Sequence, residues 1–151
     1  MRNAFTMIEL IFVIVILGIL AAVAIPKISA TRDDAKVAKV SMSIMNGATE
    51  IASYAISNGR VEDDLSLMSN SIASLVSIGE ATIDTANKKS DISFGGSTCA
   101  TMKIETDEAT GTDTLSVSFN SINTSSLCLA LQEAIDASQY PMKLRGTNVS
   151  Y

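Results

Sequence analysis

Two kinds of side chain in this sequence have the chemistry of a functional site, namely thiols and clustered carboxylates. The thiols are Cys99 and Cys128, and a catalytic thiol needs a neighbouring base that forms its thiolate. The sequence contains no histidine, which removes the commonest such base and also the commonest metal ligand. A P-loop, a dinucleotide-binding fingerprint and a plausible catalytic triad are also missing. The sequence therefore predicts a protein that is not an enzyme.

The clustered carboxylates lie in a polar stretch, residues 106–114 (TDEATGTDT). Asp107, Glu108 and Asp113 offer the oxygen ligands that calcium prefers. Their spacing matches no dedicated calcium loop, so the stretch predicts a solvated hairpin turn, with a calcium site as the alternative. We expect no cofactor.

One further carboxylate, Glu9, lies inside a long apolar run. Residues 5–25 are 21 residues with this single charge, and as a helix they have the length of a bilayer core, roughly 30 Å. Arg2 and the amino terminus precede the run and favour a cytoplasmic N-terminus. A carboxylate in hydrocarbon is costly unless it is paired. A signal anchor, or a secretory signal cut after the small residues 22–24, is the ordinary alternative.

The residues around Glu9 carry a family resemblance. The stretch 4–10 (AFTMIEL), followed by the apolar run and Pro26-Lys27, closely resembles the N-terminal signature of type IV prepilins and pseudopilins. The resemblance implies that a prepilin peptidase cuts between Ala4 and Phe5 and that the new amine of Phe5 is methylated. In the family Gly usually precedes the cut, and Ala4 departs from that pattern.

The same resemblance implies that Glu9, Gly18 and Pro26 act in assembly. Glu9 of one subunit can meet the amine of Phe5 of its neighbour, which neutralises both charges and fixes the axial register. Gly18 and Pro26 are the two poorest helix formers, and in several filaments of the family the helix unwinds between such positions. The alternatives are a carboxylate that snorkels to the interface and a simple kink at the membrane exit.

Elements that position these residues follow from hydrophobic periodicity. One helix is predicted from about residue 5 to residue 57, and Asn58-Gly59 ends it. Its second half is amphipathic, with a single apolar face made of Val37, Val40, Ile44, Ala48, Ile51 and Ala55.

The distal part of the chain predicts a small mixed head. A second helix begins after Asp63 or Asp64 and carries apolar residues as far as Val76, and residues 82–89 form a loop. Strands are predicted at 91–94, 99–105 and 115–119, a short helix capped by Ser125 or Ser126 follows, and a last strand lies within 142–151. The fold class is α+β, a pilin-like fold with a long N-terminal helix packed on a small antiparallel sheet. The expected divisions are a leader at 1–4, a transmembrane and polymerisation helix at 5–26, its amphipathic continuation at 27–58 and a head at 59–151.

The two cysteines lie beyond the membrane segment, where the compartment is oxidising. A Cys99–Cys128 disulfide would close a loop of about 30 residues and stabilise the head by roughly 3–4 kcal/mol. In the family the type IV pilins often carry a disulfide near the C-terminus, whereas the major secretion pseudopilins usually lack one.

Charge separates the two halves of the chain. Residues 27–60 hold five basic and three acidic side chains, net +2, whereas residues 61–151 hold five basic and twelve acidic ones, net −7. An acidic head disfavours nucleic-acid binding. The resemblance to prepilins implies a filament subunit that starts as an inner-membrane precursor and ends in a periplasmic or cell-surface filament. The partners that it implies are copies of the chain itself, the prepilin peptidase, the inner membrane, and an assembly ATPase acting through a platform protein. A type II secretion pseudopilin and a signal-anchored periplasmic binding domain that does not polymerise remain the alternatives.

Overall fold

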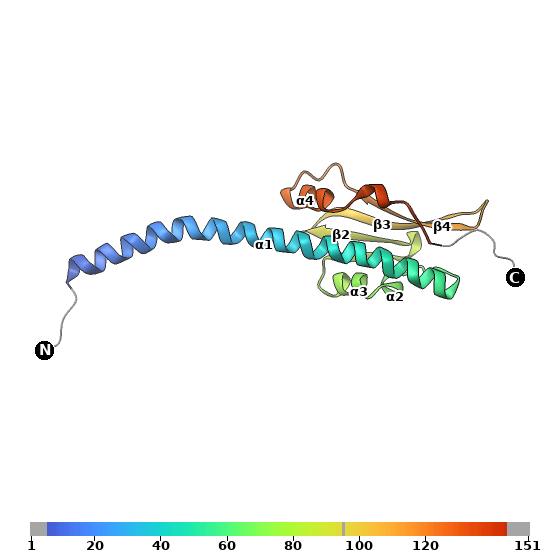
Figure 1. Cartoon of the computed structure of the whole chain (residues 1–151), viewed down its shortest axis with the longest axis horizontal. Coiled ribbons are helices and arrows are strands. Elements are labelled where there is room, and N and C mark those ends of the chain that lie inside the picture. Colours follow the sequence, from blue (N-terminus) through green and yellow to red (C-terminus); the bar gives the residue numbers. More distant parts are fainter. Residues whose placement is uncertain (1–5, 95, 145–151) are drawn as a thin grey trace. The chain divides into compact units, whose positions relative to one another are not determined.

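The computed structural model describes residues 6–94 and 96–144 and confirms the predicted α+β class (Figure 1). Among these residues the strands form one antiparallel sheet in the order β1-β2-β3-β4-β5. In chain order the elements are α1 (Met7–Asn58), α2 (Leu65–Met68), α3 (Asn70–Ser77), β1 (Ala81–Asp84), η1 (Thr85–Asn87), β2 (Lys89–Phe94), β3 (Ser97–Asp107), β4 (Thr112–Phe119), α4 (Ser126–Ala134), η2 (Ala137–Gln139) and β5 (Met142–Lys143).

The chain divides into two compact units, and the boundary lies between Lys36 and Val37 within α1. The first unit contains the N-terminal part of α1, and the second contains the rest of α1 with all the other elements. The second unit, residues 37–151, is called the head unit.

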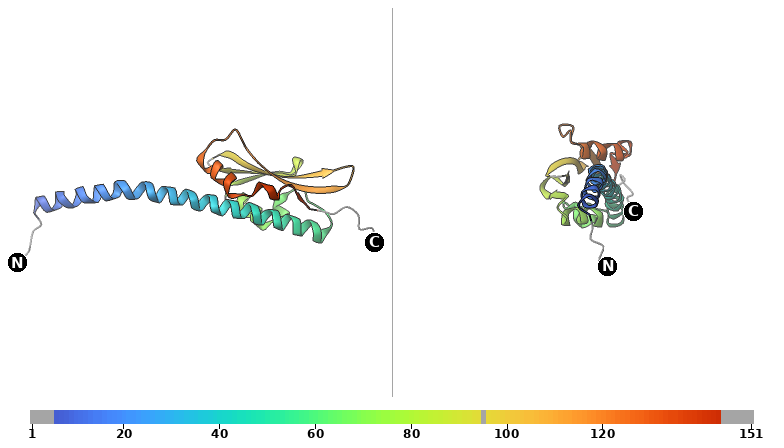
Figure 2. Two further views of the ribbon diagram at one scale, coloured as in Figure 1. Left: turned by 45° about the horizontal axis from the view of Figure 1, so that its top comes forward. Right: turned by 90° about the vertical axis from the view of Figure 1, so that its left-hand side faces the viewer.

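The core of the head unit forms between one face of α1 and the sheet. Every residue of the predicted apolar face of α1 is buried, which confirms the periodicity of this segment. Figure 2 shows residues 37–58 of α1 lying along the strands within this unit. The strands contribute alternate residues to the same core, among them Ile92, Met102, Ile104 and Leu115.

The second predicted helix is in fact two short helices that meet at Ser69. Ser69 has an extended backbone, and its Oγ accepts the backbone N–H of Ile72 at 3.0 Å, which caps α3. The Ser69 hydroxyl donates to Glu50 Oε2 at 2.6 Å, and the Ser71 backbone N–H donates to the same oxygen at 3.0 Å. These bonds, with that of Ser69 first, lower the pKa of Glu50. The predicted uninterrupted helix was wrong because serine hydrogen-bonds to its own backbone neighbourhood and favours a cap.

The predicted loop at residues 82–89 was also wrong in its first half. Residues 81–84 form the edge strand β1, which pairs with β2 in register from Ala81–Ile92 to Asp84–Lys89. The turn that follows is η1, and Asp84 Oδ1 caps it by accepting the Asn87 backbone N–H at 3.2 Å.

Strand β3 contains a β-bulge next to a cysteine. Its register with β2 shifts between the pairs Ile92–Ala100 and Ser93–Thr98, so Cys99 is an extra residue on β3. Cys99 and Ala100 are both buried although they are consecutive. The bulge therefore turns the Cys99 side chain to the buried side of the sheet, where ordinary alternation would have placed it outside.

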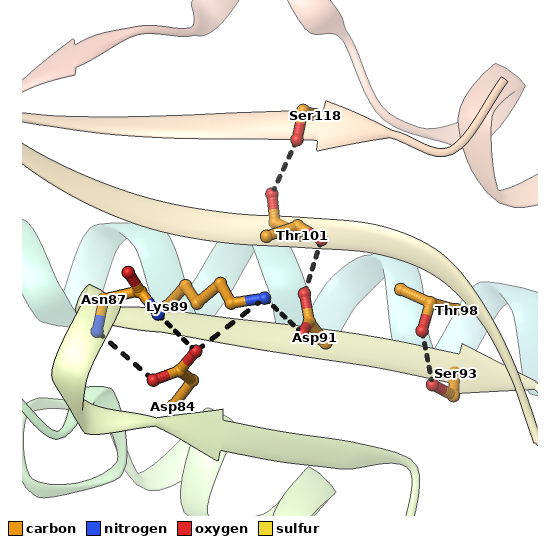
Figure 3. A network of polar contacts seen from close by, with 8 residues as sticks. All are labelled: Asp84, Asn87, Lys89, Asp91, Ser93, Thr98, Thr101 and Ser118. Atoms are coloured by element: carbon orange, nitrogen blue, oxygen red, sulfur yellow. Dashed lines mark hydrogen bonds and ion pairs between the residues drawn. The ribbon is translucent and has the colours of Figure 1, made fainter.

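The opposite face of the sheet is polar (Figure 3). Lys89 Nζ lies 2.8 Å from Asp91 Oδ2 and 4.0 Å from Asp84 Oδ2, and the Thr101 hydroxyl donates to Asp91 Oδ1 at 2.6 Å. Burial raises the pKa of Asp91, but the hydrogen bonds from Lys89 and Thr101 outweigh it and lower the pKa. These side chains link three neighbouring strands through their outward-facing positions.

Candidate functional site

The first turn of α1 holds the predicted assembly carboxylate. The Thr6 backbone N–H donates to Glu9 Oε2 at 2.8 Å, and the Thr6 hydroxyl donates to the same oxygen at 2.6 Å. In return the Glu9 backbone N–H points at Thr6 Oγ1 at 3.4 Å. This reciprocal pair is a capping box, which satisfies backbone donors that the first turn of a helix leaves without partners.

Sequence reasoning missed Thr6, although the signal was present as Thr-x-x-Glu ahead of an apolar run. Both side-chain bonds end on Oε2. In the part of the chain that the structure describes, Oε1 of Glu9 has no hydrogen bond. The predicted cleavage and methylation residues, Ala4 and Phe5, lie outside the described residues.

The N-terminal part of α1 is apolar on all sides and exposed. Mean hydropathy reaches 3.1 over an 18-residue window, and no residue of that window is buried. Large apolar side chains from Met7 to Ile28 are between 40% and 84% exposed. Among the described residues, α1 is the one helix whose length and composition would allow it to cross a membrane. A helix that is apolar on all sides is stable only when lipid or other helices surround it.

Gly18 and Pro26 both lie inside this helix, which continues through them. A Cβ on Gly18 would meet no atom within 4 Å, so nothing in the described chain requires a glycine there. Pro26 has no N–H, and the carbonyl of Ala22 therefore loses its ordinary helical donor. The two predicted weak points stand as predictions, because unwinding and kinking are not tested by a single subunit.

The three calcium candidates occupy different environments. Asp107 lies at the end of β3 and accepts the Ala109 N–H at 3.0 Å and the Thr110 hydroxyl at 2.7 Å. The Thr110 bond is the main reason that the pKa of Asp107 is lowered. Glu108 is exposed in the turn.

Asp113 does not belong to the solvated turn, and that assignment was wrong. It lies in β4, is 1% exposed, and its Oδ1 accepts the Thr106 hydroxyl at 2.7 Å. Asp113 and Leu115 stand two residues apart, as buried residues of one strand do, and this spacing was the sequence signal for a strand. The polar composition of residues 106–114 favoured a turn instead. Within residues 6–94 and 96–144, no group of three or more Asp, Glu or Cys side chains could hold a metal ion.

The two cysteines are bonded to each other. Cys99 comes from the bulge of β3 and Cys128 from the first turn of α4, and their Cα atoms are 5.0 Å apart. Ser125 caps α4 by accepting the Cys128 N–H at 3.3 Å, one of the two capping residues that the sequence offered. The disulfide ties α4 to the middle of the sheet.

The comparisons with known proteins concern the N-terminus. Residues 1–25 match the family model of the prokaryotic N-terminal methylation motif, the prepilin-type signature of type IV pilins and pseudopilins. This match covers the predicted cut, the capping box and the whole of the apolar run at residues 5–25. No curated protein and no solved structure matches the chain significantly. The motif and the apolar helix together indicate a membrane-anchored precursor of pilin type and a structural subunit rather than an enzyme.

Proposed function

We propose that this chain is the structural subunit of a type IV pilus-like filament. It enters the inner membrane as a precursor, prepilin peptidase cuts it between Ala4 and Phe5, and the new amine is methylated. The subunits then assemble through their N-terminal helices into a periplasmic or cell-surface fibre. The observation that carries the proposal is the methylation motif on a helix whose described side chains from Met7 to Ile28 expose their apolar surface.

Glu9 is the assembly residue of this proposal. Thr6 holds Oε2 of its carboxylate at two points, which leaves Oε1 to accept the amine of Phe5 from a neighbouring subunit. The pair is strong in hydrocarbon, where each charge alone would be costly. The ion pair therefore fixes the axial position of each subunit relative to its neighbour in the fibre.

Gly18 and Pro26 are proposed to let the helix extend during assembly. A Cβ on Gly18 would meet no atom within 4 Å in the described chain, and Pro26 already removes one helical hydrogen bond. The disulfide between Cys99 and Cys128 supports a pilus-type subunit over a major secretion pseudopilin, since the family's pilins more often have one. An assembly ATPase acting through a platform protein would drive the process.

Intact mass spectrometry and electron microscopy of envelope fractions test the proposal together. The mature chain should lack Met1–Ala4 and carry one added methyl group on Phe5, and fibres should be visible. Glu9→Ala should leave the precursor level and membrane insertion unchanged but give few or no fibres, and Glu9→Gln should be intermediate at best. A mature chain beginning at Ile25, or isolated membrane-bound heads without fibres, would contradict the proposal.

A further inference from the structure

The connections between elements gather at two ends of the head unit, and the two ends differ in charge. At the first end Phe94 of β2 pairs with Ser97 of β3, and β4 ends beside them at Phe119. The described connections here are residues 78–80, 96 and 120–125, and Glu80 is their one charged side chain. We call these residues the low-charge end. The connections at the opposite end, residues 59–64, 85–88 and 108–111, hold Arg60, Glu62, Asp63, Asp64, Lys88 and Glu108.

The head-unit part of α1 begins at the low-charge end. The chain that leaves α1 reaches the opposite end at once, where Asp63 Oδ1 lies 3.4 Å from Lys88 Nζ. Val37 therefore stands at the low-charge end, and Figure 1 shows α4 beside the same part of α1. Residues 29–36 join Val37 to the exposed apolar stretch that ends at Ile28, and they cover about 30 Å at most even when fully extended. A membrane-anchored precursor therefore holds this end of the head unit near the lipid surface.

The turn at residues 120–125 presents an isoleucine from this end. Ile122 is 89% exposed, which by itself is ordinary on a protein surface. Its backbone N–H donates to Asn120 Oδ1 at 3.1 Å, and the Asn123 N–H donates to the Asn120 carbonyl at 3.2 Å. The Nδ2 groups of both asparagines donate to the Thr98 carbonyl at 3.2 Å. The protein itself therefore satisfies the backbone donors on which the exposed side chain stands.

Such a turn suits the interface of a membrane. A peptide N–H in surroundings of low polarity is costly unless it is hydrogen-bonded, and these N–H groups are bonded within the turn. An open hollow beside Ile122 is lined by the hydroxyl and amide side chains of Ser97, Thr98, Asn120 and Asn123, which can hydrogen-bond to lipid headgroups. Lys39, exposed near the start of this part of α1, is attracted to anionic headgroups.

We propose that in the precursor the low-charge end rests on the outer surface of the inner membrane, with Ile122 inserted among the headgroups. The inference concerns the subunit before assembly and shares with the proposed function only the membrane anchorage. Charge favours lipid over a second copy as the occupant. A second head stacked in the same direction would bring its opposite end, with its charged connections, against Ile122.

The test places a fluorophore on the turn of the full-length chain. Ser121→Cys adds one free thiol beside Ile122, because both native cysteines are bonded, and this thiol takes an environment-sensitive dye. Leu67→Cys is the matched site, since Leu67 is 69% exposed and lies in α2, next to the opposite end. The chains are reconstituted at high dilution in vesicles of phosphatidylethanolamine and phosphatidylglycerol, with or without nitroxide-labelled lipid. The dye on the turn should lose about half of its emission or more to the nitroxide lipid, whereas the dye at residue 67 should keep its emission.

Charge insertion identifies the side chain responsible. In the Ser121→Cys chain, Ile122→Glu should restore the emission, and Leu67→Glu, the control, should leave the quenching unchanged. Both side chains are exposed, so both variants should unfold at the denaturant concentration of the parent. Emission from the turn that nitroxide lipid does not quench, or quenching that survives Ile122→Glu, would overturn the inference. Shielding that appears only when several chains share a vesicle would overturn it in favour of a second copy. Chains that do not float with the vesicles would instead contradict the membrane anchorage on which the proposed function also rests.

Discussion

Thr6 holds Glu9 by two hydrogen bonds to one carboxylate oxygen, at 2.8 Å from its backbone N–H and at 2.6 Å from its hydroxyl. The two bonds hold the Glu9 side chain back across the first turn of α1, against Thr6. Glu9 is thus both the cap of the helix and the group that we assign to assembly.

The first prediction follows from this relationship. Thr6→Val keeps the shape of the side chain but removes the hydroxyl bond, which is worth about 1 kcal/mol, so fibre yield should fall several-fold. Thr6→Ser should restore most of the yield. Because Thr6 adjoins the proposed cut, yield is measured relative to the processed pool, quantified by mass spectrometry. Equal losses in Val and Ser variants would mean that the hydroxyl does not position Glu9.

The second prediction concerns the disulfide. Envelope-extracted chain should react with a thiol reagent only after reduction, and Cys99→Ser should lower the free energy of unfolding by about 3 kcal/mol. The double variant Cys99→Ser/Cys128→Ser should cost no more than either single variant, because one bond is lost in each case. Denaturant unfolding of the chain in detergent measures the three variants side by side. A double variant much less stable than the singles would point to lost packing instead.

The third prediction uses the lowered pKa of Glu50. A carboxylate whose pKa is lower in the folded state stabilises the fold above its unfolded pKa, and this contribution disappears as pH falls through the folded pKa. The stability of the wild type should therefore decrease between about pH 5 and pH 2 more than that of Glu50→Gln. At neutral pH the variant should be less stable by about 1 kcal/mol, since Glu50 bonds to Ser69 and Ser71. If the free energy of unfolding fell equally with pH in the two proteins, Glu50 would not contribute to the acid sensitivity of the fold.

The fourth prediction concerns the close contact of Gly47 with α3. A Cβ at this position would lie 2.9 Å from Cδ1 and Cγ1 of Ile72, which is fully buried. Gly47→Ala gains up to about 1 kcal/mol in helix propensity but overpacks this contact at a cost of about 1–3 kcal/mol. The substitution should therefore destabilise the wild type. In an Ile72→Ala background it should be neutral or stabilising, and thermal unfolding of the four proteins completes the cycle.

The helix and its buried face were predictable because their signal is long and regular. Six core residues from Val37 to Ala55 recur at helical spacing over five turns, and all are buried. Strands β2, β3 and β4 were found, with the last residues of β2 and β4 predicted correctly and the other ends off by two or three residues, because alternation marks the centre of a strand better than its limits.

The missed features depend on partners that are distant in the sequence. The segment 81–84 is too short to show the alternation of a strand in its sequence. It forms β1 because β2 supplies backbone hydrogen-bond partners along its length. The break at Ser69 is stabilised by Glu50, 19 residues earlier in the chain. The burial of Asp113 follows from the register of β4 on β3, where it pairs with Thr106. At the N-terminus the Thr6–Glu9 pair depends on no distant partner, and Thr-x-x-Glu ahead of an apolar run is a sufficient signal for it.

Because of the bulge in β3, formation of the Cys99–Cys128 disulfide depends on the register between β2 and β3. Cys99 faces α4 only because one extra residue separates the pairs Ile92–Ala100 and Ser93–Thr98. A slip of one residue would carry the thiol to the polar face of the sheet, out of reach of Cys128. In an oxidising compartment the bond therefore closes in chains whose hairpin is correctly aligned and leaves misaligned chains reduced. Free thiols at Cys99 and Cys128 would therefore report a head whose β2–β3 hairpin is out of register.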